Sequence, residues 1–147
     1  MKIGFFAGCF TILTAGHVDA FRRAKDQCDE LWVLTNQDEY VKNKKGCVPV
    51  PVMEKMQILR SVKYVDEVLA YKEMTEEDVV IQLIDDNLTV YGSDTKFVIF
   101  HSQEMKQKHV NGERVPCEGI VDEIIYLENA PTKSVSDIFE TIRAAND

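Results

Sequence analysis

The sequence predicts an α/β fold: a doubly wound sheet of about five parallel strands with helices on both faces. Two observations predict it. Short, fully apolar runs such as "KIGFFA" have the character of strands that are buried on both faces. These runs alternate along the chain with segments whose apolar residues recur at helical spacing. With 147 residues and 45% hydrophobic content, the chain is expected to form one domain, 1–147.

The first half supplies two strands, two helices and a third strand. Lys2–Ala7 and Leu31–Thr35 are short apolar runs and are expected to be buried strands. Between them, Val18, Phe21 and Ala24 recur at helical spacing, which predicts a helix over 17–27. A polar, lysine-rich loop, "NQDEYVKNKKGCVPVP", follows the second strand. A helix is then expected over 52–62, with the stripe Met53, Met56, Leu59 and Val62 toward the core, and a third strand over 65–71.

The second half completes the alternation. Thr75 followed by Asp78 resembles a capping pair and predicts a helix over 75–86. "LTVYG", Leu88–Gly92, is interpreted as the fourth strand, and "DEIIYLE" as the fifth. Ser134 is expected to open the last helix, with Val135, Ile138 and Ile142 on its inner side. The stretch 95–119 is hard to interpret, with room for a short strand, a polar helix near 103–109 and an Asn-Gly turn. The whole pattern is Rossmann-like, so ligands are expected beyond the carboxyl ends of the strands.

Composition excludes several classes of protein. The net charge of −8 disfavours a nucleic-acid binder, and no apolar run is long enough for a membrane span. The N-terminus does not have the pattern of a signal peptide, so a cytoplasmic protein is expected. Four cysteines, Cys9, Cys28, Cys47 and Cys117, show no spacing typical of zinc sites and are expected to be reduced and mostly buried.

The join between the first strand and the first helix, "GCFTILTAGH", holds the strongest functional signal. A helix that begins at the carboxyl end of a buried strand presents free N–H groups to an anion. Gly8 and Gly16 allow close approach by a ligand, and Thr11 and Thr14 offer hydroxyls. His17 can donate a hydrogen bond to a phosphate oxygen, and protonation would add positive charge. The alternative is an ordinary turn with a surface cap.

This ordered set resembles the signature of the nucleotidyltransferase superfamily, Gly-x-Phe-Asp-x-x-(His/Thr)-x-Gly-His. Within it, the chain is most similar to glycerol-3-phosphate cytidylyltransferases and to the heptose-1-phosphate adenylyltransferase domain of ADP-heptose synthesis. The similarity continues through "NQDEYVKNKKG", "VPVPVMEKMQIL", "YVDEV", "VYGSD" and "SVSDI". It weakens only across 95–119.

The resemblance implies roles for particular residues. It assigns catalysis to His17, Thr14 and Lys42. It assigns nucleotide or substrate binding to Gly8, Cys9, Phe10, Thr11, Gly16, Lys45, Lys55, Gly92, Asp94, Ser134 and Ser136. Lys44 lies close enough to Lys42 to share its role. Four positions depart from the family pattern: Thr11 replaces the signature aspartate, Lys55 an arginine, Val135 a threonine and Asn129 an upstream arginine, for which Lys133 is a partial substitute. His101 and His109 are expected on the surface.

The resemblance also implies an activity: transfer of a nucleotidyl group from CTP or ATP to a phosphorylated polyol or sugar, with release of pyrophosphate. It implies Mg²⁺ bound mainly through the nucleotide phosphates, no protein ligand to a metal, and a homodimer. The residues do not decide between CTP and ATP or identify the acceptor. One alternative is a nucleotide-binding homologue that has lost catalysis and works through a partner, and a weaker one is an α/β interaction module without nucleotide.

Overall fold

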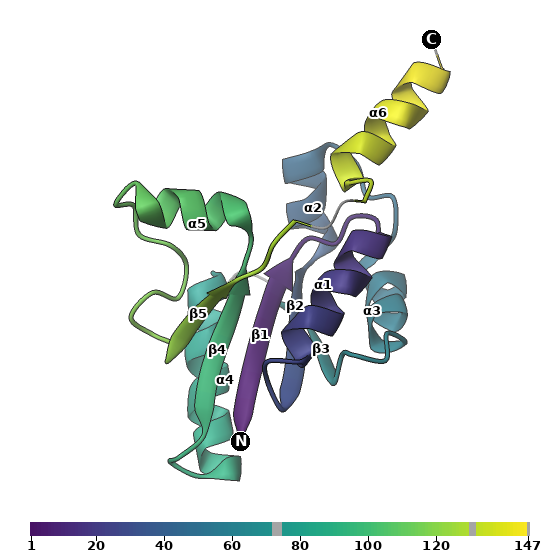
Figure 1. Ribbon diagram of the computed structural model, residues 1–147. Helices are drawn as coiled ribbons and strands as arrows, with labels where there is room; N and C mark the ends of the chain where they lie inside the picture. Colours follow the sequence, from purple (N-terminus) through teal and green to yellow (C-terminus); the bar gives the residue numbers. More distant parts are fainter. Residues whose placement is uncertain (72–74, 130–131, 147) are drawn as a thin grey trace.

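A computed structural model describes residues 1–71, 75–129 and 132–146. It contains one sheet of five parallel strands in the order β3-β2-β1-β4-β5 (Figure 1). The strands are β1 (Lys2–Gly8), β2 (Glu30–Asn36), β3 (Glu67–Tyr71), β4 (Lys96–His101) and β5 (Glu123–Tyr126). In the centre of the sheet, Phe6 pairs with Val33 on one side and with Phe100 on the other. The predicted α/β class and parallel sheet are confirmed.

Six helices connect the described strands or follow them. They are α1 (Ala15–Lys25), α2 (Asp38–Lys45), α3 (Val52–Arg60), α4 (Glu76–Tyr91), α5 (Gln103–Val110) and α6 (Val135–Ala145). Four begin with a hydroxyl side chain that accepts a hydrogen bond from the backbone three residues on, at Thr14, Thr75, Ser102 and Ser134. The predicted caps at Thr75 and Ser134 are therefore confirmed.

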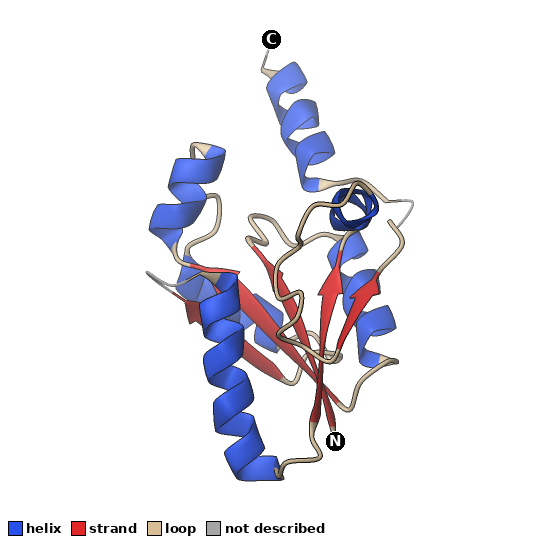
Figure 2. Ribbon diagram, turned by 90° about the vertical axis from the view of Figure 1, so that its left-hand side faces the viewer, coloured by secondary structure: helices blue, strands red, loops and turns tan. Residues whose placement is uncertain are grey.

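The sheet lies between two helical layers (Figure 2). On one face α1 and α3 pack through Phe21, Ala24 and Leu59, which join a cluster with Val33 and Phe100. On the other face α4 packs through Val79 and Val80 against side chains that include Phe5 and Ile99. Because β1 and β4 are covered on both sides, their sequences are apolar except at their ends. The helices cover the two faces of the sheet, so a ligand site is expected at the carboxyl ends of the strands.

The predicted fourth strand is wrong. Leu88 to Tyr91 is the last turn of α4, which ends at Gly92 with φ 103°. The true fourth strand, β4, lies within the stretch that was hard to interpret, and all its residues except Lys96 are buried. The β-branched and aromatic letters of "LTVY" favour a strand locally, but Leu88 continues the helical stripe of Val80 and Ile84 toward the core.

Smaller corrections concern exposed residues. The lysine-rich loop contains a helix, α2, which ends at Gly46 with φ 84°. Met53 points to solvent with 71% of its surface exposed, so only the rest of its stripe faces the core. Among the cysteines, all free, only Cys117 is buried, and Cys47 is exposed. The polar helix near 103–109 and the turn at Asn111–Gly112 are confirmed.

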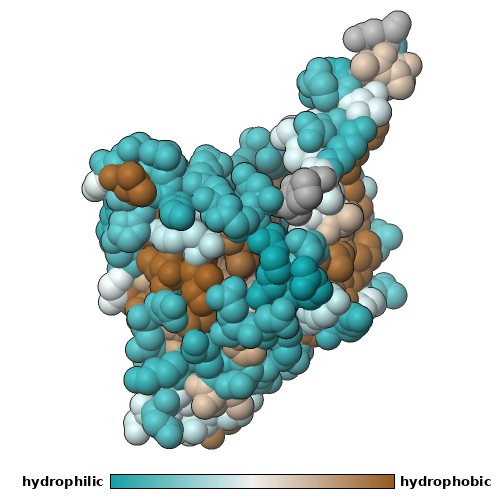
Figure 3. Space-filling view, viewed as in Figure 1, coloured by the Kyte–Doolittle hydropathy of each residue, from teal (hydrophilic) through white to brown (hydrophobic). Residues whose placement is uncertain are grey.

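The last helix projects from the body of the molecule (Figure 1). None of its residues is fully buried, and Ile142, expected on an inner side, is 51% exposed. Apolar surface follows one flank of α6, on the right in Figure 3. No helix of the described residues is both long and apolar enough to cross a bilayer.

Candidate active site

A cleft of about 620 Å³ opens at the carboxyl edge of the sheet, where β1 and β4 lie side by side. This is the point at which the strand order reverses, because the chain runs outward from β1 to β3 and then returns to the other side of β1 at β4. Crevices at such reversals are the usual ligand sites of open α/β sheets. Of the fourteen residues to which the resemblance assigns a catalytic or binding role, seven line it: Gly8, Cys9, Phe10, Thr14, Gly16, His17 and Ser134.

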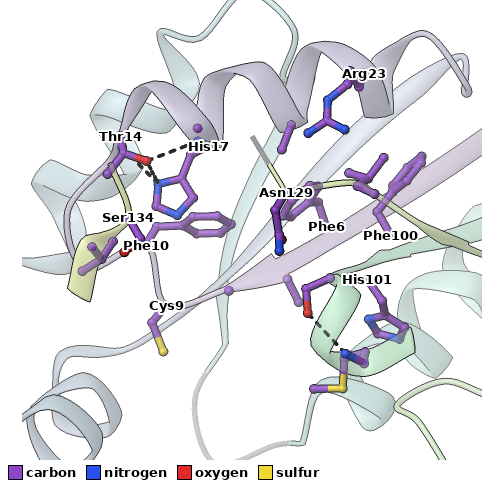
Figure 4. A pocket seen from close by; sticks show the side chains of 18 of the residues that line it. Phe6, Cys9, Phe10, Thr14, His17, Arg23, Phe100, His101, Asn129 and Ser134 are labelled. Carbon is purple, nitrogen blue, oxygen red and sulfur yellow. Dashed lines mark hydrogen bonds between the residues drawn. The ribbon is translucent and has the colours of Figure 1, made fainter. Parts of the chain in front are cut away.

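The first turn of α1 fixes the tautomer of His17. The backbone N–H of Thr14 donates to His17 Nδ1 at 3.0 Å, and the N–H of His17 donates to Thr14 Oγ1 at 3.3 Å (Figure 4). A backbone N–H can only donate, so Nδ1 must accept and the ring proton of the neutral imidazole lies on Nε2. The cleft is therefore lined by a histidine whose Nε2–H is a donor with no partner among the described residues.

Burial favours the uncharged form of this imidazole. Desolvation lowers the pKa of His17 below its ordinary value, and protonation would also remove the acceptor that Thr14 uses. The positive charge considered from the sequence is thus disfavoured. The Phe10 ring meets the His17 ring edge to face, with centroids 5.2 Å apart, and holds its orientation. Phe10 itself has φ 45°, a strained backbone for a bulky residue, directly beneath the histidine.

A second helix start faces the same cleft. Ser134 caps α6, with its Oγ accepting from the N–H of Asp137 at 3.1 Å, while Asp137 accepts from the N–H of Ser134 at 3.0 Å. Lys133 and Val135 also line the cleft. Two helix N-termini, each with partial positive charge and free N–H groups, therefore open onto one space. A polyphosphate is the ligand that this arrangement suits best.

The segment after β5 is fixed by an arginine to which the sequence pattern assigns no role. Arg23 of α1 donates from Nη2 to the carbonyl of Glu128 at 2.6 Å and from Nε to Asp19 at 3.0 Å. The next residue, Asn129, and Arg23 both line the cleft (Figure 4). The contact spans more than a hundred residues of sequence, so no local pattern indicates it.

His101 is also part of the site, contrary to the expected surface position. It ends β4, is 8% exposed and lines the cleft. Its Nε2 lies 2.8 Å from the carbonyl of Pro116, which can only accept, so Nε2 holds the proton and Nδ1 is the free acceptor. Burial lowers the pKa of His101, and the bond to Pro116 partly opposes this. His109 lies outside the cleft, against Tyr126 and Glu118.

Comparison with known proteins decides the family. The sequence profile of the family described as "Cytidylyltransferase-like" matches residues 5–140, which is nearly the whole chain. This chain belongs to the cytidylyltransferase-like family. It is accordingly a nucleotidyltransferase, and the cleft between β1 and β4 is its candidate active site.

Individual relatives agree with this assignment. The FAD synthase of Thermococcus kodakarensis is 31% identical over 137 residues, covering 92% of this chain and 87% of that protein. The bifunctional protein HldE of Shewanella piezotolerans is 43% identical over 139 residues, and the match spans only 27% of its length. A crystal structure described as the lipopolysaccharide core biosynthesis protein of Thermoplasma volcanium superposes with a TM-score of 0.63, covering 88% of this chain and 98% of that one at 21% identity. This last similarity supports the fold.

Several residues singled out in this cytidylyltransferase-like chain do not line the cleft. Lys42 and Lys45 are exposed on α2, and Ser136 is exposed on α6. Thr11 is 3% exposed and lines a separate small cavity beside α3. The sequence resemblance marks these positions, but the described geometry does not bring them to the space that His17 and Ser134 share.

Lys55 has a different place from the one implied by the family pattern. It is 4% exposed, and its Nζ donates to the carbonyls of Cys9 at 2.8 Å and Asn36 at 3.2 Å. Burial lowers its pKa. The ammonium group thus ties α3 to the ends of β1 and β2 and supports the turn that leads to His17.

Gly92 and Asp94 lie at the wrong edge of the sheet for nucleotide binding. They were expected to follow a strand, but they connect α4 to the start of β4. The beginning of a parallel strand lies opposite the edge that holds the cleft. Gly92 ends a helix there, and the carbonyl of Gly92 accepts a bond from Thr95 Oγ1 at 2.8 Å.

The described residues form no group of three or more His, Cys, Asp or Glu side chains that would hold a metal ion. The cleft offers hydroxyl and N–H groups together with two separate carboxylates, Glu76 and Glu128. This suits Mg²⁺ that is bound mainly by substrate phosphates and water, as Mg²⁺ commonly is.

Proposed function

We propose that this enzyme transfers a nucleotidyl group from CTP or ATP to a phosphorylated polyol or sugar and releases pyrophosphate. The observation that supports it most is the convergence of the neutral His17 Nε2–H and the starts of α1 and α6 on one cleft. All these groups are donors without full charge. Such preorganised donors stabilise charge that develops on phosphate oxygens during transfer.

The proposed reaction is a single in-line displacement. An ionised oxygen of the acceptor phosphate forms a bond to the α-phosphorus, while the bond from that phosphorus to the bridging oxygen of pyrophosphate breaks. His17 donates to an α-phosphate oxygen, and Thr14 holds it in the required tautomer. Pyrophosphate leaves toward Ser134 and the N-terminus of α6. No general base is needed, because the acceptor phosphate is already ionised.

Mg²⁺ has a limited role in this proposal. When bound with the triphosphate, it would neutralise part of the negative charge on the phosphates. Lys42, Lys44 and Lys45, exposed on α2 at the carboxyl end of β2, are proposed to contact the acceptor phosphate.

Two of the four departures from the family pattern fall outside the cleft, which favours an active enzyme over a homologue that has lost catalysis. Thr11 lines a separate small cavity, and Lys55 binds backbone carbonyls. Only Val135 and Asn129 line the cleft, and the neighbouring Ser134 and Lys133 keep a hydroxyl and a cation there.

The test is pyrophosphate release by the purified protein with Mg²⁺, CTP or ATP, and a panel of polyol and sugar phosphates. We expect one nucleotide to raise the melting temperature and to support turnover. The variant His17→Gln keeps a capping side chain and should retain much of the binding, but lose about 100-fold in turnover, the usual cost of one transition-state donor. His109→Gln, outside the cleft, is the matched control. Nucleotide binding without turnover on any acceptor would favour the homologue that has lost catalysis.

We also propose a homodimer in which the apolar flank of α6 is covered by a second copy. An isolated eleven-residue helix is marginal in water, so the partly exposed Ile138, Phe139 and Ile142 favour a packing partner. Light scattering after size exclusion should give twice the mass of 16.8 kDa. Ile142→Glu should shift the population toward monomer, whereas a monomeric wild-type protein would exclude this arrangement.

A further inference from the structure

We propose that Glu76 selects the acceptor by binding its hydroxyl groups, which makes it a specificity-determining residue of the cleft. This inference rests on the function proposed above. Glu76 is the first residue of α4 and lines the cleft, in a position to which the sequence signature assigns nothing. A carboxylate is an unusual group to find in a site for phosphates, so its position needs a chemical reason.

The three acidic residues that open α4 have different surroundings. Asp78 is exposed, and Glu77 bonds to Arg114 and accepts from the N–H of Cys117 at 2.8 Å. Glu76 is partly buried and borders the cleft. A helix N-terminus lowers the pKa of a nearby carboxyl group, yet burial, followed by repulsion from Glu77, raises that of Glu76. The effect of burial on the pKa of Glu76 is therefore larger than the opposite effect of the helix dipole.

The two faces of the sheet place Glu76 opposite the leaving group. His17 belongs to α1, which packs on one face, whereas Glu76 belongs to α4, which packs on the other. In-line transfer requires the attacking and leaving oxygens on opposite sides of the α-phosphorus. With His17 at the α-phosphate and pyrophosphate leaving toward Ser134, the acceptor enters from the α4 side. Glu76 therefore faces the acceptor.

Charge decides which part of the acceptor Glu76 contacts. A carboxylate repels the acceptor phosphate, so its partner is an uncharged group that can donate hydrogen bonds. Hydroxyl groups on the carbons next to the phosphate meet this need, as in a polyol or sugar phosphate. Tyr71, at the end of β3, is near enough that the charge of Glu76 adds to the burial that raises its pKa to about 12. The phenol is thus a neutral neighbour that leaves the carboxylate as the acceptor of those bonds.

The test compares Glu76→Gln with Asp78→Asn, which removes one charge from the same helix turn outside the cleft. Isothermal titration, with nucleotide present, measures binding of glycerol 3-phosphate, ribose 5-phosphate and ethyl phosphate, which has no hydroxyl. We expect wild-type protein and Asp78→Asn to prefer at least one hydroxylated phosphate over ethyl phosphate. Glu76→Gln should lose about tenfold in that affinity, as for one charge-assisted bond, with nucleotide affinity unchanged. The preferred ligand distinguishes an open polyol from a sugar.

Each contrary result has a separate meaning. The inference is overturned if Glu76→Gln binds all three phosphates with the affinity of wild type, or if wild type prefers neither hydroxylated phosphate over ethyl phosphate. It is also overturned if the variant changes the affinity for CTP or ATP instead, which would place Glu76 at the nucleotide base. If the protein binds no nucleotide but binds a polyol phosphate in a way that depends on Glu76, the proposed nucleotidyl transfer is refuted, whereas the role of Glu76 in binding hydroxyl groups is supported. Circular dichroism of both variants establishes that α4 is intact.

Discussion

Lys55 offers a sharp test, because the sequence and the structure give it different roles. As a phosphate ligand, it would affect nucleotide affinity and leave stability unchanged. As a buried brace that binds the carbonyls of Cys9 and Asn36, it should affect stability first. The variant Lys55→Met keeps most of the side-chain stem and its packing but removes the ammonium group.

The expected loss follows from the contacts. A hydrogen bond to a charged group contributes about 1.5–3 kcal/mol, so two such bonds contribute about 3–6 kcal/mol before offsets. Desolvation of the ammonium group, which lowers the pKa of Lys55, reduces this figure. The carbonyl of Cys9 also retains Thr35 Oγ1 at 3.3 Å as a donor. We therefore expect a loss of about 2–4 kcal/mol in unfolding free energy, or roughly 5–15 °C in melting temperature for a chain of this size.

Urea unfolding and calorimetry measure the stability, and isothermal titration with CTP and ATP measures the affinity. Lys42→Met is the matched control. Lys42 is exposed on α2, and its backbone carbonyl accepts a hydrogen bond from the N–H of Gly46 at the end of that helix, which the substitution leaves in place. It should keep the melting temperature of the wild type and reduce turnover through a weaker acceptor phosphate contact.

A melting temperature of Lys55→Met within about 2 °C of wild type, a shift equivalent to less than 1 kcal/mol, would refute the brace. The same outcome together with a tenfold weaker nucleotide complex would restore the role that the family pattern implies. A large stability loss in both lysine variants would show that exposed charge on α2 also stabilises the fold, and the loss in Lys55→Met would then not be specific to the brace.

Three further predictions concern acid, packing and thiols. Burial lowers the pKa of His17 and His101 in the folded state, so the unfolded chain binds more protons below about pH 6.5 and the free energy of unfolding falls as pH drops through that range. The variant His17→Gln should have a shallower slope of unfolding free energy against pH, and equal slopes would contradict the buried neutral imidazole. Gly4→Ala would place its Cβ 2.5 Å from Phe100 Cε2 and 2.9 Å from Cys28 Sγ, and should destabilise by about 1–3 kcal/mol in urea unfolding, with an unchanged midpoint arguing against this packing. Burial raises the pKa of Cys28 to about 11 and of Cys117 to about 12, so mass spectrometry after iodoacetamide near pH 8 should find both thiols unlabelled long after Cys47, and rapid labelling of Cys117 would contradict its burial.

Local signals predict the parts of the site that are local in sequence. The turn from Gly8 to His17 joins one strand to the next helix, so its pattern and its geometry occupy the same ten residues. The start of α6 is likewise defined by Ser134 and Asp137 alone. Both are helix starts that line the cleft, and nothing distant in the sequence is needed to form them.

The failures come from contacts that are remote in sequence. Local propensity favours a strand at Leu88–Gly92, but it contains no information on which segment pairs with β1 and β5, and that segment is β4. Because Gly92 and Asp94 precede β4 and do not follow a strand, they lie at the opposite edge of the sheet from the one predicted. Arg23 reaches Glu128 across 105 residues, and Glu76, the first residue of α4, lines the same cleft as the end of β1. Such placements depend on the assembled sheet.

A chain with net charge −8 can still bind a triphosphate if local N–H groups rather than net charge supply the attraction. Among the described residues, the charged ones that line the cleft are Arg23, Lys133, Glu76 and Glu128, and the formal charges of these two cations and two carboxylates sum to zero. The neutral His17 and the two helix N-termini must then provide the favourable field. Dipoles of this kind act over short distances and in fixed directions. This makes the site selective for a phosphate chain held at one place, whereas a cluster of lysines would attract any polyanion.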